Sequence, residues 1–187
     1  MSFYKYFKIC YDWFVALVLL LVLWPLLLVL IFVSAFDTAS NGLFIQERVG
    51  QYGRLFNIYK IRSIHRFSNK QSQFGEFLRK SKLDELPQLI NILKLEMSFV
   101  GPRPDIPGYY DKLNGENSKV LELKPGITSE ASIKYRNEES MLREQENPLK
   151  YNDEVLFPDK VKLNLKYYYE MSLATDFRIM LKTVFKI

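Results

Sequence analysis

The sequence predicts a predominantly helical α+β protein, and three observations support this fold class. A long apolar run from Trp13 to Phe36 contains no charged residue. Two later stretches, Phe74–Leu95 and Lys160–Phe185, place apolar residues at helical spacings. One pair of β-prone runs within residues 43–61 is bounded by turn residues, so we expect the strands to form a small hairpin.

Composition restricts the chemistry that is available. A chain of 187 residues suits one domain of ordinary size. Cys10 is the only cysteine and His65 the only histidine, which excludes a disulfide within the chain and a Cys/His metal cluster. The formal charge of +5 favours anionic partners, such as nucleic acid, acidic lipid or a phosphorylated substrate. Catalysis would therefore use carboxylates, hydroxyls, lysines or arginines.

The apolar run is long enough to cross a membrane. As a helix it would measure about 36 Å, against about 30 Å for a hydrocarbon core. A single span is the simplest interpretation, and a signal peptide is disfavoured because its apolar region is about 7–15 residues long. Pro25 removes one backbone hydrogen bond near the middle and favours a kink. A helix that enters and returns to the same face is therefore also allowed, and the pattern does not separate it from a span.

A hairpin is expected after the apolar run. Leu43–Val49 and Leu55–Ile61 are β-prone and are separated by the residues Gly-Gln-Tyr-Gly. The polar residues that the hairpin would carry include Gln46, Arg48, Lys60 and Arg62. Residues 65–73 are polar and aperiodic, which indicates a loop.

Two helical pieces should meet near residues 81–86. Because proline is favoured in the first turn of a helix, the second piece should start near Pro87. Asp84 and Glu85, the acidic pair, would then lie at its N-terminal end, where unpaired N–H groups carry a partial positive charge.

Three further segments follow in the sequence. Residues 96–107 are rich in proline and should form an ordered loop. A short element is expected over Asn152–Phe157. Lys160–Phe185 should form one amphipathic helix, which would lie on a membrane surface or pack in a core.

The acidic pair by itself could be structural, because acids at a helix start are common caps and Ser81-x-x-Asp84 resembles a capping box. Its combination with arginines, rigid Gly/Pro turns and a membrane segment instead suits a polyphosphate substrate. Basic side chains neutralise phosphate oxygens. One carboxylate can attack phosphorus, and a second can hold Mg²⁺.

Five motifs, in this order, resemble those of the bacterial sugar transferases, the small monotopic phosphoglycosyl transferases. The motifs are Phe44-x-Gln46-x-Arg48-x-Gly50, Tyr59-Lys60-x-Arg62-Ser63, Leu83-Asp84-Glu85-Leu86-Pro87-Gln88-Leu89-x-Asn91, Met97-Ser98-x-Val100-Gly101-Pro102-Arg103-Pro104 and Lys124-Pro125-Gly126-Ile127-Thr128. The resemblance runs from about Phe7 to the C-terminus.

The resemblance implies a two-step, ping-pong reaction. Asp84 would attack the β-phosphorus of a UDP-sugar, release UMP and hold the phosphosugar until undecaprenyl phosphate collects it. Glu85 matches the carboxylate associated with Mg²⁺. The basic positions near the nucleotide and its phosphates are matched by Arg103, Lys60, Arg62, Arg136 and Arg48.

The resemblance also implies a re-entrant helix with its break at Pro25 and both ends in the cytoplasm. Residues 1–36 would form the membrane segment and residues 37–187 the catalytic domain, with interfacial helices, at the bacterial inner membrane. The expected partners are the donor, the lipid acceptor, the bilayer, a second copy of the chain and downstream glycosyltransferases, but not nucleic acid.

Three departures from the family pattern leave the sugar open. Ile9 follows Lys8 where a basic pair is common, Trp24 stands where serine often precedes the proline, and residues 129–132 are Ser-Glu-Ala-Ser. Two alternatives remain. One is a membrane-anchored binding module without catalysis, and the other is a sugar transferase that leaves UDP.

Overall fold

The computed structural model describes residues 2–185, which form two compact units. The N-terminal unit takes in residues 9–48 and 55–97. The C-terminal unit takes in residues 1–8, 49–54 and 98–187, as far as these are described. Helices predominate and the strands form two small sheets, so the predicted α+β class is confirmed. The functional division into residues 1–36 and 37–187, whose outermost residues lie outside the described part, remains a prediction.

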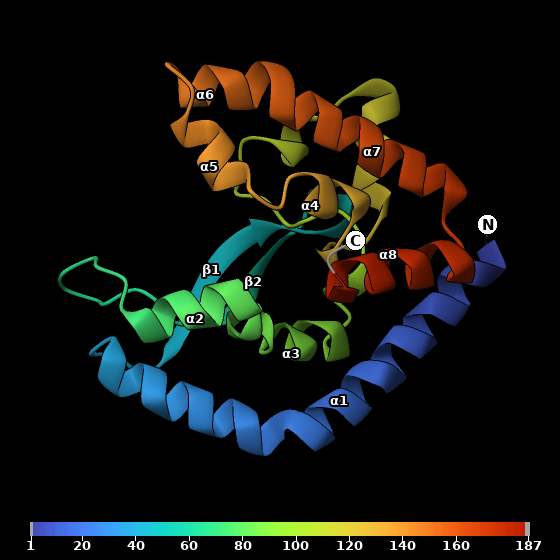
Figure 1. Ribbon diagram of the computed structural model, residues 1–187. Helices are drawn as coiled ribbons and strands as arrows, with labels where there is room; N and C mark the ends of the chain where they lie inside the picture. The colour runs from blue at the N-terminus through green and yellow to red at the C-terminus, as the bar shows by residue number, and fades with distance from the viewer. Residues whose placement is uncertain (1, 186–187) are drawn as a thin grey trace. The chain divides into compact units, whose positions relative to one another are not determined.

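Helix α1, Ser2–Asp37, contains Pro25 and stays helical through it. Proline has no N–H to donate to the carbonyl of Leu21, and its ring crowds the preceding turn. A bend is the usual result, and Figure 1 shows α1 bent near its middle. The expected break is therefore a bend in a continuous helix, and the re-entrant arrangement remains a prediction.

α1 exposes a large apolar surface. Over Tyr4–Asp37 it is the one helix among the described residues that is long and apolar enough to cross a membrane, and only 17% of its most apolar stretch is buried. Its exposed large side chains between residues 13 and 36 are those of Trp13, Phe14, Val18, Leu21, Val22, Trp24, Leu26, Leu28, Val29, Phe32, Val33 and Phe36. Burying one such side chain fully is worth about 1.5–3 kcal/mol. The helix is therefore consistent with membrane association and not with a place in a soluble core.

The N-terminal unit packs the second half of α1 against a hairpin and a helix. Strands β1 (Leu43–Val49) and β2 (Leu55–Ile61) form the predicted hairpin, with a 3-10 turn, η1 (Gln51–Gly53), in the connection. Helix α2 (Gln73–Ser81) follows a loop. The core of this unit contains Leu27, Leu30, Ile61 and Leu78.

Two helical pieces meet near residues 81–86, as predicted. α2 ends where Lys82 adopts a left-handed conformation, with φ 60° and ψ 15°. A 3-10 turn, η2 (Leu83–Glu85), follows, and helix α3 (Gln88–Leu93) begins after Pro87. The acidic pair therefore lies in a turn before α3 and does not open that helix.

Asn91 joins α3 to β2. Its side chain is fully buried, and its Oδ1 accepts a hydrogen bond from the Tyr59 N–H at 3.2 Å. Its Nδ2 donates to the Asn57 carbonyl at 2.7 Å and to Glu96 Oε2 at 2.8 Å. Because both ends of the amide are used, Asn91 fixes the strand relative to the helix.

The C-terminal unit contains a parallel sheet that the sequence pattern does not predict. Strand β3 (Ser98–Val100) pairs with strand β4 (Gly126–Thr128). A Cβ atom on Gly126 would lie 2.1 Å from the Gly101 nitrogen, and one on Gly101 would lie 2.2 Å from the Lys124 oxygen. Only glycine allows backbones to approach this closely. The sheet therefore brings two of the five motifs together.

Helices form most of the remaining C-terminal unit. They are η3 (Tyr110–Lys112), η4 (Gly115–Glu122), α4 (Glu130–Lys134), α5 (Glu138–Arg143), α6 (Pro148–Tyr151), η5 (Asn152–Leu156), α7 (Phe157–Glu170) and α8 (Leu173–Phe185). The short element predicted at η5 is a π-helical segment that joins α6 to α7. The single helix predicted over Lys160–Phe185 is wrong, because Met171 adopts an extended conformation and separates α7 from α8. The apolar face expected there is also divided, since Tyr167 is buried whereas Leu173 and Phe177 are exposed.

A buried carboxylate connects the first turns of α1 with α8 inside the C-terminal unit. Asp176 is 4% exposed, and it accepts hydrogen bonds from the hydroxyls of Tyr4 at 2.7 Å and Tyr167 at 2.5 Å. Lys8 forms an ion pair with the same carboxylate. Such partners are required because a buried charge without them is strongly destabilising.

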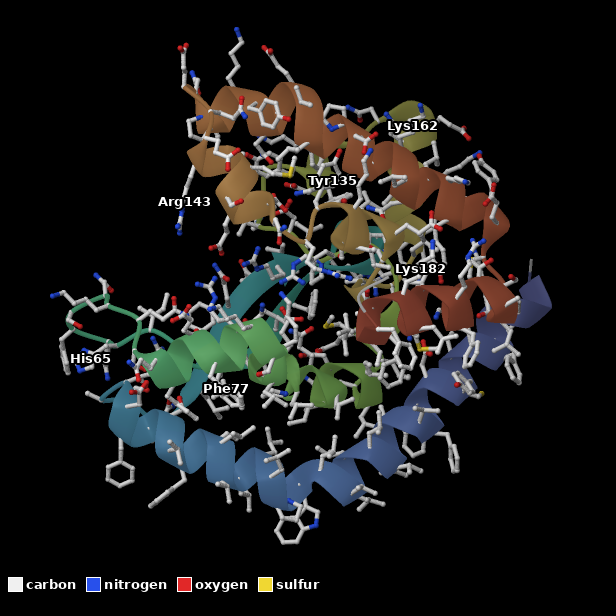
Figure 2. The ribbon with its side chains drawn as sticks, viewed as in Figure 1. His65, Phe77, Tyr135, Arg143, Lys162 and Lys182 are labelled. Carbon is white, nitrogen blue, oxygen red and sulfur yellow. The ribbon has the colours of Figure 1, made fainter. Side chains whose placement is uncertain are left out.

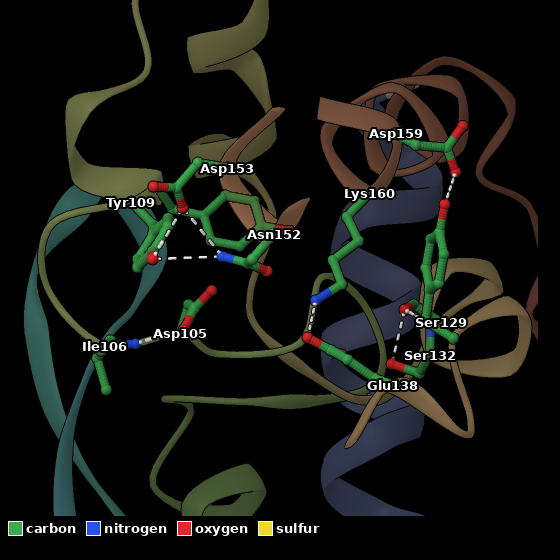
Figure 3. A network of polar contacts seen from close by, with 12 residues as sticks. Asp105, Ile106, Tyr109, Ser129, Ser132, Glu138, Asn152, Asp153, Asp159 and Lys160 are labelled. Atoms are coloured by element: carbon green, nitrogen blue, oxygen red, sulfur yellow. Dashed lines mark hydrogen bonds and ion pairs between the residues drawn. The ribbon is translucent and has the colours of Figure 1, made fainter. Parts of the chain in front are cut away.

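A second polar network ties α7 to the segment from α4 to α5 (Figure 3). Lys160 Nζ lies 2.6 Å from Glu138 Oε1, and the Tyr135 hydroxyl lies 2.7 Å from Asp159 Oδ2. Lys134 also donates to that carboxylate, at 2.6 Å. The hydrogen bonds from Lys134 and then Tyr135 hold the pKa of Asp159 below its usual value.

Asn91→Ala should lower the free energy of unfolding by about 2–3 kcal/mol, because it removes three hydrogen bonds made by a fully buried side chain. Thermal unfolding of the purified protein in detergent would measure the loss. Asn117→Ala, at an exposed position, is the matched control and should change stability by less than about 0.5 kcal/mol. Equal effects of the two substitutions would contradict the role of Asn91.

Candidate active site

The acidic pair is set in place by the backbone on both sides of it. The left-handed Lys82 turns the chain out of α2, and Pro87 cannot donate a backbone hydrogen bond to that turn. The short turn between them buries both acids, with Asp84 7% and Glu85 6% exposed. Two adjacent carboxylates at this depth are unusual, since burial favours the neutral form of each.

Lys60 provides the direct counter-charge for the acidic pair. Its Nζ lies 3.0 Å from Glu85 Oε1, and the exposed fractions of the two side chains are 19% and 6%. Lys60 comes from β2, whose position relative to the turn is fixed by Asn91 and by the packing of Ile61 in the core. The ion pair thus joins two of the five motifs.

Asp84 is the less compensated member of the pair. Its Oδ1 is buried and has no hydrogen-bond partner among the described residues. Burial, and then the negative charge of Glu85, raise the pKa of Asp84 above its usual value, whereas the positive charges of Lys60, Lys82 and Arg79 act in the opposite direction. Asp84 therefore carries a desolvated oxygen whose negative charge the nearby cations offset only in part.

Arg79 and Lys82 are two basic residues of this site that motif matching did not single out. Both act electrostatically on Asp84 from the end of α2 and the residue after it. They lie five and two residues before Asp84, and this closeness in the sequence is the one signal that could have identified them. The helix end at Lys82, which decides whether these charges face the acid, is not visible in the sequence.

The two predicted arginines of the hairpin lie in the same unit as the acidic pair. The Arg62 guanidinium lies over the Phe44 ring, 5.4 Å from its centroid, and its Nε is buried with no hydrogen-bond partner among the described residues. Arg48 donates to Gln46 Oε1 at 2.6 Å. The structure thus places Arg48 and Lys60 on the hairpin and Arg62 directly after its second strand, with Lys60 in direct contact with the pair.

The other two predicted arginines belong to the C-terminal unit. Arg103 is exposed between Pro102 and Pro104, and it lines a small, mainly apolar pocket with Gly50 and Tyr110. Arg136 is exposed after α4, and it donates to the carbonyl of Lys182 at 3.4 Å. Their role in phosphate binding remains a prediction.

The chemistry available at the acidic pair follows from these contacts. A carboxylate oxygen without a hydrogen bond keeps its lone pairs for attack on an electrophile. The neighbouring carboxylate and basic groups could hold a divalent cation and a phosphate. The arrangement therefore suits phosphoryl transfer better than a structural cap, in which the oxygen would accept backbone hydrogen bonds.

Asp84→Asn should stabilise the protein at neutral pH and so raise its unfolding temperature. The raised pKa of Asp84 means that folding favours its protonated form, so the charged form costs stability above that pKa. The gain should shrink as the pH falls, because the wild-type carboxyl then takes up a proton. Unfolding in detergent over a range of pH would measure it.

Asp159→Asn is the matched control. Its partners lower the pKa of Asp159, so its charge adds stability at neutral pH that is lost as the pH falls. This substitution should lower the unfolding temperature at neutral pH. Destabilisation by both changes would contradict the assignment of Asp84 as an uncompensated buried acid.

Comparison with known proteins places this chain in a family. The family described as "Bacterial sugar transferase" matches residues 3–187. The galactosyl transferase CpsE of Streptococcus agalactiae serotype III (strain NEM316) is 34% identical over 76% of this chain and 34% of its own length. The UDP-glucose:undecaprenyl-phosphate glucose-1-phosphate transferase of Xanthomonas campestris pv. campestris is 32% identical over 96% of this chain and 38% of its own length.

The uncharacterized sugar transferase EpsL of Bacillus subtilis (strain 168) is 31% identical over 96% of this chain and 86% of its own length. The chain thus spans little more than a third of the first two relatives and most of the third. The match covers nearly every described residue and includes all five motifs. The chain therefore belongs to the bacterial sugar transferase family.

Proposed function

We propose that this chain transfers a sugar 1-phosphate from a UDP-sugar to undecaprenyl phosphate and releases UMP. The name of the relative from Xanthomonas, a glucose-1-phosphate transferase, supports this class of reaction. The structural observation that carries the proposal is the buried acidic pair, in which Asp84 keeps an oxygen without a hydrogen bond beside the ion pair of Glu85 and Lys60. The reaction would be the first membrane step in the assembly of a glycoconjugate.

The proposed reaction has two steps. First, a carboxylate oxygen of Asp84 forms a bond to the β-phosphorus, the bond from that phosphorus to the bridging oxygen breaks, and UMP leaves with the electron pair. Then an oxygen of the lipid phosphate forms a bond to the same phosphorus, and Asp84 leaves as a carboxylate. Burial of Asp84 supports a covalent intermediate, because it keeps water from hydrolysing the phosphosugar before the lipid phosphate attacks it. Neighbouring side chains would have to move when the substrates bind.

Magnesium fits the residues that are present. Mg²⁺ is commonly held by one or two carboxylates together with substrate phosphates and water. Glu85, next to Asp84, would supply a carboxylate, and the bound substrate would supply the phosphates. The described residues contain no group of three or more metal-binding side chains, so protein ligands alone would not complete the coordination. The bound ion would neutralise negative charge on the diphosphate. The basic residues proposed to bind the nucleotide and its phosphates are Lys60, Arg62, Arg48, Arg103 and Arg136.

The acceptor lipid would reach the acidic pair from the membrane. α1 exposes its apolar surface in the unit that also holds the pair, and the bend at Pro25 supports a re-entrant helix with both ends on the cytoplasmic face of the inner membrane. In that arrangement the helix holds the catalytic residues at the interface, where a lipid phosphate is available.

Incubation with a panel of UDP-sugars and Mg²⁺ should give a phosphosugar adduct, detected by the mass of the intact protein, together with UMP. Asp84→Asn should abolish both products while the protein stays folded. Glu85→Gln should slow UMP release by about 10²-fold or more if the carboxylate helps to neutralise the transition state. Asp159→Asn is the control and should keep its activity. UDP as the product would favour direct sugar transfer, and unchanged activity of Asp84→Asn would favour a non-catalytic module.

Cysteine labelling tests the re-entrant arrangement. With Cys10 changed to serine, Tyr6→Cys and Asn41→Cys place single thiols before and after the apolar run, at exposed positions. Both thiols should react with an impermeant maleimide only after the cells are lysed. Labelling of Tyr6→Cys from outside intact spheroplasts would show that α1 spans the membrane.

A further inference from the structure

The loop between β2 and α2, residues 62–72, is called the basic loop here. It carries Arg62, His65, Arg66 and Lys70 and contains no acidic residue. Its most exposed apolar side chain is that of Phe67, with 77% of its surface accessible. The proposed reaction assigns no role to Phe67.

Hydrogen bonds close the tip of the basic loop on itself. The His65 N–H donates to the Lys70 carbonyl at 2.9 Å, and the Asn69 N–H donates to the His65 carbonyl at 3.1 Å. His65 Nδ1 accepts from the backbone N–H of Phe67 at 3.3 Å and of Ser68 at 3.2 Å. The tip therefore has a defined shape, and that shape presents Phe67 to the surroundings.

Further hydrogen bonds join the basic loop to the C-terminal end of α1. The Arg66 N–H donates to the Thr38 carbonyl at 3.0 Å, and Ser72 Oγ donates to Asp37 Oδ2 at 2.6 Å. The adjacent last turn of α1 exposes Phe36 to 75%. The loop is thus fixed at the place where the apolar helix ends.

This edge of the N-terminal unit exposes aromatic and basic side chains. The acids beside it have partners, since Asp37 accepts from Ser72 and Glu76 pairs with Lys80. Figure 2 shows His65 in the loop and Phe77, which is 53% exposed, on the side of α2 that faces α1. The Arg66 guanidinium lies 5.8 Å from the centroid of the Phe67 ring. Aromatic and basic side chains next to the end of an apolar helix are typical of a protein surface at the membrane interface.

We propose that the basic loop docks on the membrane surface, with Phe67 in the headgroup region and Arg66 and Lys70 on the phosphates of acidic lipids. The proposal rests on membrane association of α1, and it holds for a spanning or a re-entrant helix because residue 38 lies at an interface in both. Basic residues close to an acidic membrane surface are attracted to its lipid phosphates.

The contact would have a consequence for the site. β2 ends at Ile61, directly before the basic loop, and carries Lys60. A loop held on the headgroups would therefore fix the depth of Lys60 and of the acidic pair relative to the bilayer. Isolated exposed aromatic residues are common on proteins. Here the fixed tip, the bonds to the end of α1 and the one-sided charge distinguish Phe67 from such cases.

The depth of the loop can be measured with spin labels. In a Cys10→Ser background, Phe67→Cys is labelled in the full chain, reconstituted in nanodiscs that hold one copy each so that a second copy cannot cover the loop. Collision rates with oxygen, which concentrates in lipid, and with a water-soluble nickel complex give the depth. We expect the label at position 67 to report the headgroup region. It should lie deeper in membranes of phosphatidylcholine with phosphatidylglycerol than in membranes of phosphatidylcholine alone.

Three comparisons make the outcome decisive. Phe32→Cys on α1 should report lipid and Glu47→Cys, exposed on β1, should report water. When Arg66→Gln and Lys70→Gln are added to the Phe67→Cys protein, the depth of the label should no longer depend on phosphatidylglycerol. Water at position 67 with lipid at position 32 would overturn the docking of the loop, whereas water at both positions would overturn membrane association itself. None of these readings depends on enzymatic activity, so a failed activity assay leaves the test intact.

Discussion

Burial of two adjacent carboxylates with one directly bonded lysine is the constraint on which the N-terminal unit depends. Charge of this density is stable in a protein interior only when basic groups lie at fixed distances. Lys60 meets this need because Asn91 fixes its strand relative to α3, and the next residue of the strand, Ile61, packs in the apolar core. The hairpin, α3 and the second half of α1 thus form a rigid support for a site that would be unstable alone.

The C-terminal unit is organised by backbone proximity. Gly101 and Gly126 allow two Pro-containing segments to meet, which sets the position of Arg103 on one of them. Asp176 holds the first turns of α1 through Tyr4 and Lys8. The chain therefore passes from one unit to the other inside α1, so that a single helix contributes to a polar contact in one unit and to an apolar core in the other.

The sequence predicted what local chemistry decides. Turn residues and β-prone runs predicted both strands of the hairpin with their exact ends. Pro87 predicted the start of the helix that follows the acidic pair. The strands β3 and β4 have three residues each, too few for an alternating pattern. Neither glycine nor proline marks the end of α7 at Met171. The helical spacing of apolar residues continues past this point in the sequence, although the helix itself ends there. The contact of Lys60 with Glu85 joins residues 25 positions apart and depends on packing that no local pattern encodes.

Lys82 also matters for protein engineering. A left-handed conformation strains any residue with a side chain by about 1 kcal/mol or more, and a stability-guided redesign would place glycine there. Glycine would relax the backbone and at the same time remove one of the cations near Asp84. A design criterion that scores only conformational preference would therefore remove a positive charge from the surroundings of Asp84.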